Sequence, residues 1–183
     1  MTKSFEDTKI VEIGDPILRT PARPLFPEEI LSEEIQNLIQ IMKATMRKAL
    51  GIGLAAPQIG LSLQLIVIED KKEYYSSLDA EQIAEHERTE IPFHVVINPK
   101  LTVLGGDVAE FFEDCLSFPG WMAVVPRAKS VHVEYLNEEA KPCEILAKGW
   151  YARILQHEID HVNGILYLDR AYPHTLMSME NNH

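Results

Sequence analysis

The residues with the clearest capacity for chemistry are two histidines and a glutamate within residues 150–162. This stretch contains no Gly or Pro, which predicts one helix, and His157 and His161 lie four positions apart on it. That spacing places both imidazoles on one helical face, where they can bind a single metal ion. Glu158 can then accept a proton from water at the metal. Gly164 suits a left-handed cap that ends the helix.

A histidine pair around a glutamate also occurs by chance in solvated helices, so the rest of the helix decides between the two interpretations. Its apolar residues are Ile154, Leu155, Ile159 and Val162. They supply a face that packs against a core, and the histidines therefore lie near that core and not on a free surface. This pattern favours a metal site over a solvated helix.

Two histidines leave a metal short of ligands, and the third ligand determines the class of reaction. A metzincin protease would have histidine at position 167, where this chain has Tyr167. Glu180 could serve a protease with a downstream glutamate ligand, but it lies in a polar tail that looks poorly anchored. Asp169 stays open as a carboxylate ligand. Cys115 is more attractive because it follows an expected strand and would bind a metal as a thiolate.

A second unusual stretch covers residues 51–60. Its small residues and glycines let another backbone approach closely, as an extended substrate would require. Gln58 follows a proline and offers a fixed amide that could donate to a developing oxyanion. Without the histidine pair, a tight loop with a surface glutamine would be the favoured interpretation. The stretch lacks the Lys-Ser/Thr ending of a phosphate-binding loop.

Length, charge and cysteine content limit the classes of protein to consider. A chain of 183 residues is most simply one domain, residues 1–183, and its net charge of −11 argues against general nucleic-acid binding. No apolar run approaches the ~20 residues of a membrane span, and the first residues lack the apolar core of a signal peptide. Two cysteines, Cys115 and Cys143, do not make a disulfide framework, so we expect a reducing cytoplasm.

The remaining pattern predicts an α+β fold. Apolar residues at helical spacing predict an N-terminal helix from Pro27 to near Leu50. Residues 70–90 are polar and charged, so we expect an exposed, partly helical insertion, and residues 171–183 form a short tail. Short strands are expected over 63–68, 95–99, 101–104, 122–125, 131–136 and 143–147. We therefore expect antiparallel β-sheets around a central metal-binding helix.

Three separated motifs resemble those of the peptide deformylases. They are GIGLAAPQ at 51–58, EDCLS at 113–117 and QHEIDH at 156–161. The agreement extends from about Ile10 to about Arg170, which is nearly the whole chain. Three motifs in this order and spacing are far more specific than any one of them alone.

The resemblance implies a metal-dependent hydrolase that removes the N-formyl group from the N-terminal methionine of newly synthesised polypeptides and releases formate. It implies one divalent metal held by Cys115, His157 and His161, with Fe(II) in cells and Zn(II), Ni(II) or Co(II) in purified protein. N-formylmethionyl nascent chains would be the partners. We expect weak or transient ribosome contact, because no Lys or Arg follows Pro173, and no direct binding of nucleic acid or membrane.

The resemblance also assigns roles by motif position. Glu158 would act as the general base and then as the general acid. Gln58 and the backbone N–H of Leu116 would form the oxyanion hole, and Gly53 would hydrogen-bond the substrate through its backbone. Glu113 and Arg127 match a family ion pair that braces the strand carrying the cysteine.

One position departs from the family pattern. Asp114 stands where bacterial members most often have Gly, and some organelle-type members carry a bulkier residue there. Residues 149–155 and the segment 70–90 also resemble the organelle-type branch. A carboxylate beside the metal would raise the local negative potential and favour cation retention. Asp114 therefore bears on substrate fit and metal preference.

Three other classes share part of this pattern. A metalloprotease would use the same histidines and Glu158 but would cleave internal peptide bonds. A formyl-peptide-binding relative without turnover should lack a ligand or the glutamate, and neither is missing. A structural metal site would fill its fourth position with another Cys or His, for which Cys143 is available in principle.

Overall fold

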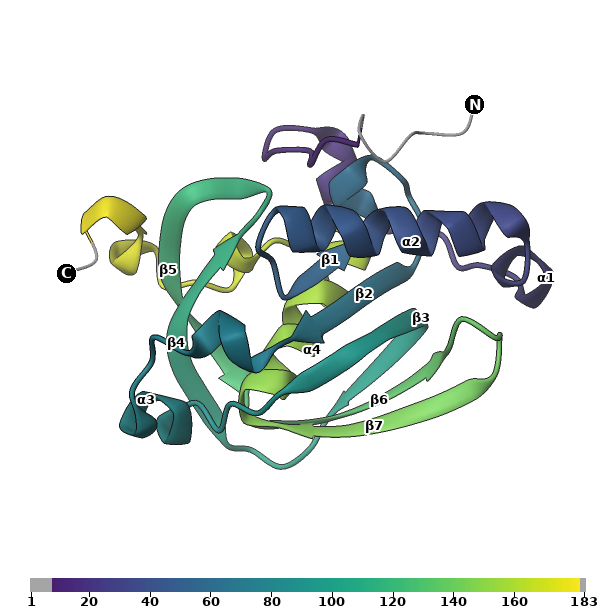
Figure 1. Cartoon of the computed structure of the whole chain (residues 1–183). Helices are drawn as coiled ribbons and strands as arrows, with labels where there is room; N and C mark the ends of the chain where they lie inside the picture. Colours follow the sequence, from purple (N-terminus) through teal and green to yellow (C-terminus); the bar gives the residue numbers. More distant parts are fainter. Residues whose placement is uncertain (1–7, 182–183) are drawn as a thin grey trace.

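The computed structural model describes residues 8–181, and within that range the strands form two antiparallel sheets (Figure 1). The first sheet has the spatial order β1 (Gly53–Ala55), β2 (Leu65–Asp70), β3 (Ile91–Val103), β6 (Ser130–Leu136) and β7 (Pro142–Lys148). The second has the order β4 (Val108–Cys115), β5 (Phe118–Ala128) and β8 (Met177–Ser178). The expected α+β class with antiparallel sheets is confirmed.

Four α-helices accompany these sheets within the described residues: α1 (Pro27–Ile30), α2 (Glu33–Lys48), α3 (Ala80–Glu85) and α4 (Gly149–Val162). Short 3-10 helices cover Pro16–Arg19, Ala56–Ile59, Lys72–Tyr75, Tyr167–Asp169, Pro173–Thr175 and Met179–Asn181. None of the helices in residues 8–181 combines the length and apolar character that crossing a bilayer requires. The N-terminal start at residues 1–7 and the last two residues of the expected tail lie outside the described residues.

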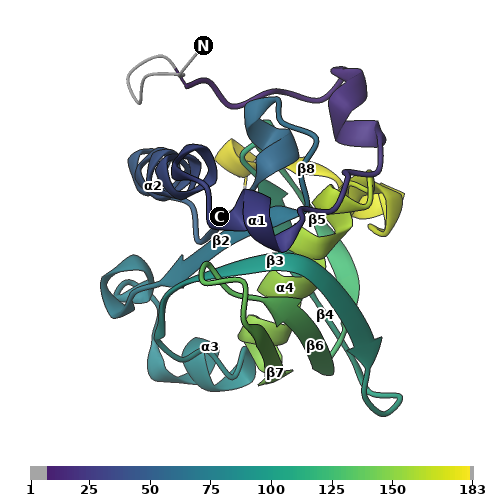
Figure 2. The same cartoon turned by 90° about the vertical axis from the view of Figure 1, so that its right-hand side faces the viewer.

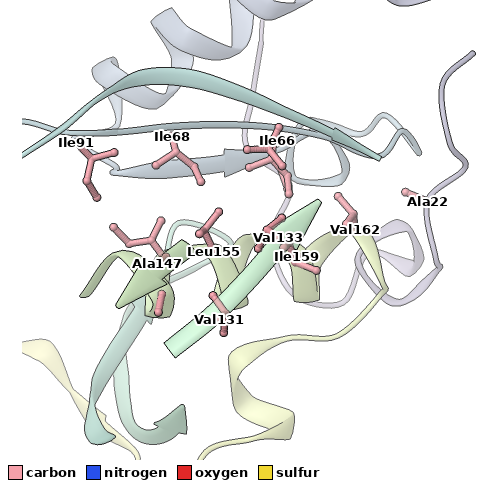
Figure 3. Close-up of a cluster of buried hydrophobic side chains, with 14 residues drawn as sticks. Ala22, Ile66, Ile68, Ile91, Val131, Val133, Ala147, Leu155, Ile159 and Val162 are labelled. Atoms are coloured by element: carbon pink, nitrogen blue, oxygen red, sulfur yellow. The ribbon is translucent and has the colours of Figure 1, made fainter. Parts of the chain in front are cut away.

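The helix α4 contacts strands of both sheets, which places it at the centre of the fold (Figure 2). Strand β2 is buried on both faces because α4 covers one face and α2 the other. Ile66 and Ile68 point toward Leu155 and Ile159 of α4, as Figure 3 shows. Leu65 and Val67, which alternate with them along the strand, pack in the cluster beneath α2. Because side chains alternate between the two faces of a strand, β2 packs against α4 on one face and against α2 on the other.

The N-terminal helix is interrupted, where the sequence predicts one continuous helix. The chain turns at Leu31, and Ser32 starts α2 by accepting a hydrogen bond from Ile35 N at 3.3 Å. A serine that caps a helix end competes with continuation of the preceding helix. Helix α2 buries Leu38 and Met42 against the first sheet.

The strand β3 is continuous, where the sequence predicts two strands around a proline break. The register shifts between Ile97 and Lys100, which indicates a bulge. Asn98 adopts a positive φ of 52° in this bulge, and its side chain bonds Leu25 N at 2.9 Å and Leu25 O at 2.8 Å. A bulge accommodates Pro99 because one residue there leaves the hydrogen-bond ladder.

The expectation that residues 70–90 are exposed is wrong at two positions. Asp70 has no exposed surface and forms an ion pair with Arg88, and Tyr75 is also buried. Most other residues of the segment are exposed, and α3 confirms that it is partly helical. The polar composition of the segment did not indicate that Asp70 and Arg88, near its two ends, form a buried ion pair.

The expectation of a poorly anchored tail is also wrong. Strand β8 pairs with β5 through Trp121 and Met122. Just before it, Thr175 Oγ1 accepts a hydrogen bond from Val124 N at 2.9 Å. These contacts fix residues 173–178 against the second sheet, even though Pro173 limits the helix to a short piece as expected.

Replacing Asn98 by alanine should lower the free energy of unfolding by about 2–3 kcal/mol. The substitution removes two hydrogen bonds and places alanine in a left-handed conformation. Asn98→Asp retains an acceptor for Leu25 N but places a carboxylate oxygen against Leu25 O, so it should also lower the free energy of unfolding. Urea unfolding of metal-saturated protein measures both. An unchanged stability in Asn98→Ala would show that the bulge does not depend on this side chain.

Candidate active site

Three potential metal ligands come together where α4 meets the end of β4. Ligand atoms of Cys115, His157 and His161 all lie within 4.8 Å of one another, and Cys115 Sγ is 3.3 Å from His161 Nε2. Cys115 and His161 are buried, and His157 is half-buried. A thiolate and two imidazoles suit a divalent transition metal better than Mg²⁺ or Ca²⁺. The residues present therefore fit one such ion.

The orientation of His157 supports this fit. Its Nδ1 lies 3.0 Å from Oε2 of Glu113. Because a carboxylate only accepts hydrogen bonds, the ring donates through Nδ1 and leaves the Nε2 lone pair available to a metal. Burial lowers the pKa of His161 well below its usual value, so this ring is neutral and can also act as a ligand.

Glu158 lies beside these residues with an unused oxygen. Among the residues described, no hydrogen-bond partner contacts its buried Oε2. Burial raises the pKa of Glu158 to about 7. Its other oxygen packs against Gly53, where a Cβ atom would lie only 2.3 Å from Oε1. The absence of a side chain at Gly53 thus lets this carboxyl group lie against β1. With this pKa, neither the protonated nor the charged form of Glu158 is strongly favoured near neutral pH, so the group can accept and return a proton.

Gln58 is held in one orientation. Its Oε1 accepts a hydrogen bond from Ala55 N at 2.9 Å, which directs Nε2 toward Ser117 Oγ at 3.3 Å and Cys115 Sγ at 3.7 Å. Gln58 is 1% exposed, so the alternative of a surface glutamine on a loop is wrong. The amide N–H group therefore lies next to the potential metal ligands.

Glu113 links the second sheet to α4. Its carboxylate accepts from Arg127 Nε at 2.9 Å, Arg127 Nη2 at 3.0 Å and Arg153 Nη1 at 2.7 Å, in addition to His157. Burial opposes its charge, but the hydrogen bonds from His157 and Arg127 outweigh that effect and hold the pKa of Glu113 well below its usual value. The carboxylate thus stays charged while it orients His157.

Two charged residues of α4 to which the sequence assigned no role contact the residues that support this site. Arg153 bonds Glu113, Val125 O and Ala109 O, and Asp160 accepts from Arg127 Nη1 at 2.5 Å. Helical spacing gave a usable signal for both. Arg153 is four residues before His157, and Asp160 is three residues after it, so both lie near the face of the potential ligands.

The alternative ligands lie elsewhere. Asp169 pairs with Arg19 and accepts from Leu166 N, and it is not in the cluster of potential ligands. Cys143 lies on β7 and is not in that cluster either. Among the described residues, Cys115 therefore has the position expected of a third ligand.

A cavity of about 310 Å³ leads to these residues. Its lining includes Gln58, Cys115, His157 and Glu158. The walls include Ala49, Leu50, Gly51, Ile52, Gly53, Phe112, Glu113, Asp114, Leu116, Trp150, Arg153 and Ile154, with Tyr74 and Arg88 completing the lining. Asp114 also has an exposed side chain, between the buried Glu113 and Cys115. The structure thus brings every predicted site residue except Arg127 and His161 to this cavity, and those two contact the lining residues Glu113 and Cys115.

Comparisons with known proteins agree with this geometry. The polypeptide deformylase family model matches residues 7–176. Peptide deformylase 1A, chloroplastic, of Solanum lycopersicum is 46% identical over 172 residues, which cover 94% of this chain and 62% of that protein. Peptide deformylase 1A, chloroplastic/mitochondrial, of Arabidopsis thaliana is 45% identical over 179 residues, covering 98% of this chain and 66% of that protein. The chain thus spans slightly less than two thirds of the length of each of these relatives.

Solved structures give the same result. The Met-Ala-Ser-bound class I type b peptide deformylase of Acinetobacter baumannii superposes with a TM-score of 0.80 at 31% identity, covering 93% of this chain and 99% of that one. The family match includes both α4 and the strand that ends at Cys115. On its sequence and on its fold, this chain belongs to the polypeptide deformylase family.

Proposed function

We propose that this chain hydrolyses the N-formyl group from the N-terminal methionine of newly synthesised polypeptides and releases formate. Family membership supports the reaction class. The observation that carries the proposal is a carboxyl oxygen of Glu158 that has no hydrogen-bond partner among the described residues, in the cavity that Cys115 and His157 line and beside their cluster with His161. Because α4 contacts both sheets, we further propose that residues 1–183 act as one catalytic domain.

The metal ligands in this proposal are Cys115, His157 and His161. A divalent metal, when bound there, would supply Lewis acidity that lowers the pKa of water and polarises a carbonyl group. Three protein ligands leave a coordination position open, as catalysis requires. Fe(II) is the proposed metal in cells, and Zn(II), Ni(II) or Co(II) can occupy the same donor set in purified protein. Metal analysis of protein purified without oxygen tests the choice of iron.

The remaining chemistry falls to four groups of the chain. Glu158 takes the proton of the attacking water and returns a proton to the departing amine. Gln58 Nε2 and the N–H of Leu116 donate to the formyl oxygen as negative charge develops on it. Strand β1 lies at the edge of its sheet, so Gly53 can offer its backbone to an extended substrate. The substrate would then run alongside β1, with its formyl group at the metal ligands.

Glu113 and Arg127 have a positioning role in this scheme. Glu113 fixes the ring of His157, and Arg127 joins Glu113 to Asp160 across the second sheet and α4. Neither residue need touch the substrate to affect the reaction. Loss of either one would release His157 from its hydrogen bond or leave a buried charge unpaired.

The rival classes fit less well. Among the described residues, no fourth Cys or His joins the potential ligands, which disfavours a structural metal site. Glu158 is present, which disfavours a binding protein without turnover. A metalloprotease shares the same residues and is separated from a deformylase by its products.

We also propose that access to nascent chains occurs by weak or transient ribosome contact. Residues 171–183 contain no Lys or Arg, and the net charge is −11, so phosphate binding has little support. Both cysteines are free in the structure, which is consistent with the proposed cytoplasmic location, although the two plant relatives named above carry organelle names. Cosedimentation with ribosomes and cell fractionation test these two points.

The function itself is tested by formate release. Metal-loaded protein should release formate from formyl-Met-Ala-Ser and leave an unformylated internal peptide intact. The ratio of the two activities separates a deformylase from a metalloprotease. Cleavage of the internal peptide with no formate release would overturn the proposal.

Glu158→Gln should retain the metal and lose about 10²–10⁴-fold in turnover, because glutamine cannot accept the proton. Glu144→Gln, which changes an exposed carboxylate on β7, serves as the control and should leave turnover unchanged. Metal content and formate release are measured on the same samples. Turnover near the wild-type value in fully metal-loaded Glu158→Gln would exclude the proposed role.

Cys115→Ser should reduce the affinity for a transition metal steeply, because it replaces a soft thiolate by a poorly ionised hydroxyl. Cys143→Ser is the matched control, since Cys143 lies outside the cluster of potential ligands. Competition with a chromophoric chelator measures both affinities. The reverse order of effects would show that the third ligand has been assigned wrongly.

A further inference from the structure

We propose that Arg88 closes the end of the substrate cavity remote from the metal ligands and so limits the length of the first side chain that the enzyme accepts. This inference rests on the proposed function. It assigns a specificity-determining role to the segment between β2 and β3, which the sequence indicated only as an exposed insertion. Two residues of that segment, Tyr74 and Arg88, line the cavity.

The cavity extends along α4. Trp150 and His157 both line it and are seven residues apart on this helix. At 1.5 Å per residue, that separation is about 10 Å along the helix axis. Cys115 and His157 therefore line one part of the cavity, and Trp150 lines a part that is about 10 Å from His157 along the helix.

Arg88 lies beside Trp150 in the cavity lining. Its guanidinium carbon is 5.2 Å from the centre of the Trp150 ring and 4.6 Å from the centre of the Tyr75 ring. Its side chain is only 11% exposed. A planar guanidinium in contact with two aromatic rings can form a flat wall, and it is less strongly hydrated than an ammonium group would be.

Asp70 holds this wall in place. Its two oxygens accept from Arg88 Nε at 2.8 Å and from Nη2 at 2.9 Å, and the aspartate is completely buried. A bidentate pair fixes the guanidinium in both position and direction. Asp70 is the last residue of β2, so the anchor belongs to the sheet and not to a loop.

The segment is also attached to α4 itself. Trp150 N donates to His86 O at 2.9 Å, and the His86 and Trp150 rings stack with centroids 4.8 Å apart. A Cβ atom on Gly149 would lie 2.4 Å from Glu87 Cβ, so the two backbones approach as closely as a glycine allows. These contacts keep the segment from moving aside when a longer side chain enters.

Closure of the cavity by Arg88 predicts an upper limit on the length of the first side chain of the substrate. With the formyl group at the metal ligands, the first side chain would extend toward Trp150 and meet Arg88. One methylene group in such a pocket commonly changes kcat/KM by 10–200-fold. Norleucine matches the length of methionine, whereas 2-aminooctanoic acid is two methylene groups longer, so the pair isolates length from other properties.

The experiment compares kcat/KM for formyl-norleucyl-Ala-Ser and formyl-2-aminooctanoyl-Ala-Ser. The wild type should prefer the shorter substrate. In Arg88→Ala, the relative kcat/KM of the longer substrate should rise at least about 10-fold. The ratio is measured on one preparation, so it does not depend on the fraction of folded or metal-loaded enzyme.

A second variant covers the case in which Arg88→Ala fails to fold because it leaves the buried Asp70 charge unpaired. The double variant Asp70→Asn/Arg88→Ala removes that charge and should show the same change in ratio. Arg47→Ala is the matched control. Arg47 forms an equivalent bidentate pair with Glu69, the neighbouring residue on β2, but it does not line the cavity. Its ratio should stay within about twofold of wild type, well below the methylene effect.

Binding supplies a readout that needs no turnover. The unformylated peptides norleucyl-Ala-Ser and 2-aminooctanoyl-Ala-Ser are titrated into metal-loaded protein by calorimetry, and the ratio of their Kd values should change in the same direction. A wild type that binds with this preference but releases no formate would overturn the proposed function and not the role of Arg88. Ratios that are equal in the wild type, or unchanged in both Arg88 variants, would overturn the role of Arg88.

Discussion

The rest of the site depends on the hydrogen bonds and ion pairs that the buried carboxylate of Glu113 makes. It sits on β4, receives two arginines from β5 and α4, and orients His157 on α4. A buried charge that lost these partners would cost several kcal/mol, so the second sheet and the central helix cannot separate without a large penalty. The same contacts determine which nitrogen of His157 faces Cys115. The stability of the sheet–helix junction and the geometry of the potential metal site therefore depend on the same contacts.

The parts of the site that the sequence predicted are those set by local spacing. His157 and His161 share a helical face because they are four residues apart, and this follows from helix geometry alone. Gly53 and Gln58 belong to a stretch of small residues whose composition indicated close backbone contact. The preference for Cys115 over Asp169 rested on its place after a strand, and the structure puts its sulfur 3.3 Å from His161 Nε2.

The parts that it did not predict depend on pairs distant in sequence. Asp70 and Arg88 are 18 residues apart, and Arg153 is 40 residues from Glu113. Each charged residue taken alone indicates exposure, and only the pairing in the fold makes burial favourable. The bulge at Asn98 is similar, because its φ depends on hydrogen bonds to Leu25 from a distant segment. Local pattern therefore predicted elements and missed the charged contacts between them.

Glu113 and Glu158 show how one site gives two carboxyl groups opposite properties. Both are buried, and both belong to elements that meet at Cys115. Glu113 accepts hydrogen bonds from three residues, which stabilise its charged form and hold its pKa well below the usual value. Glu158 has an oxygen without a partner among the described residues, and burial raises its pKa to about 7. Environments that separate two carboxyl groups in this way divide the work between them. Glu113 is suited to hold a structure that must not change during reaction, and Glu158 is suited to a proton that must move.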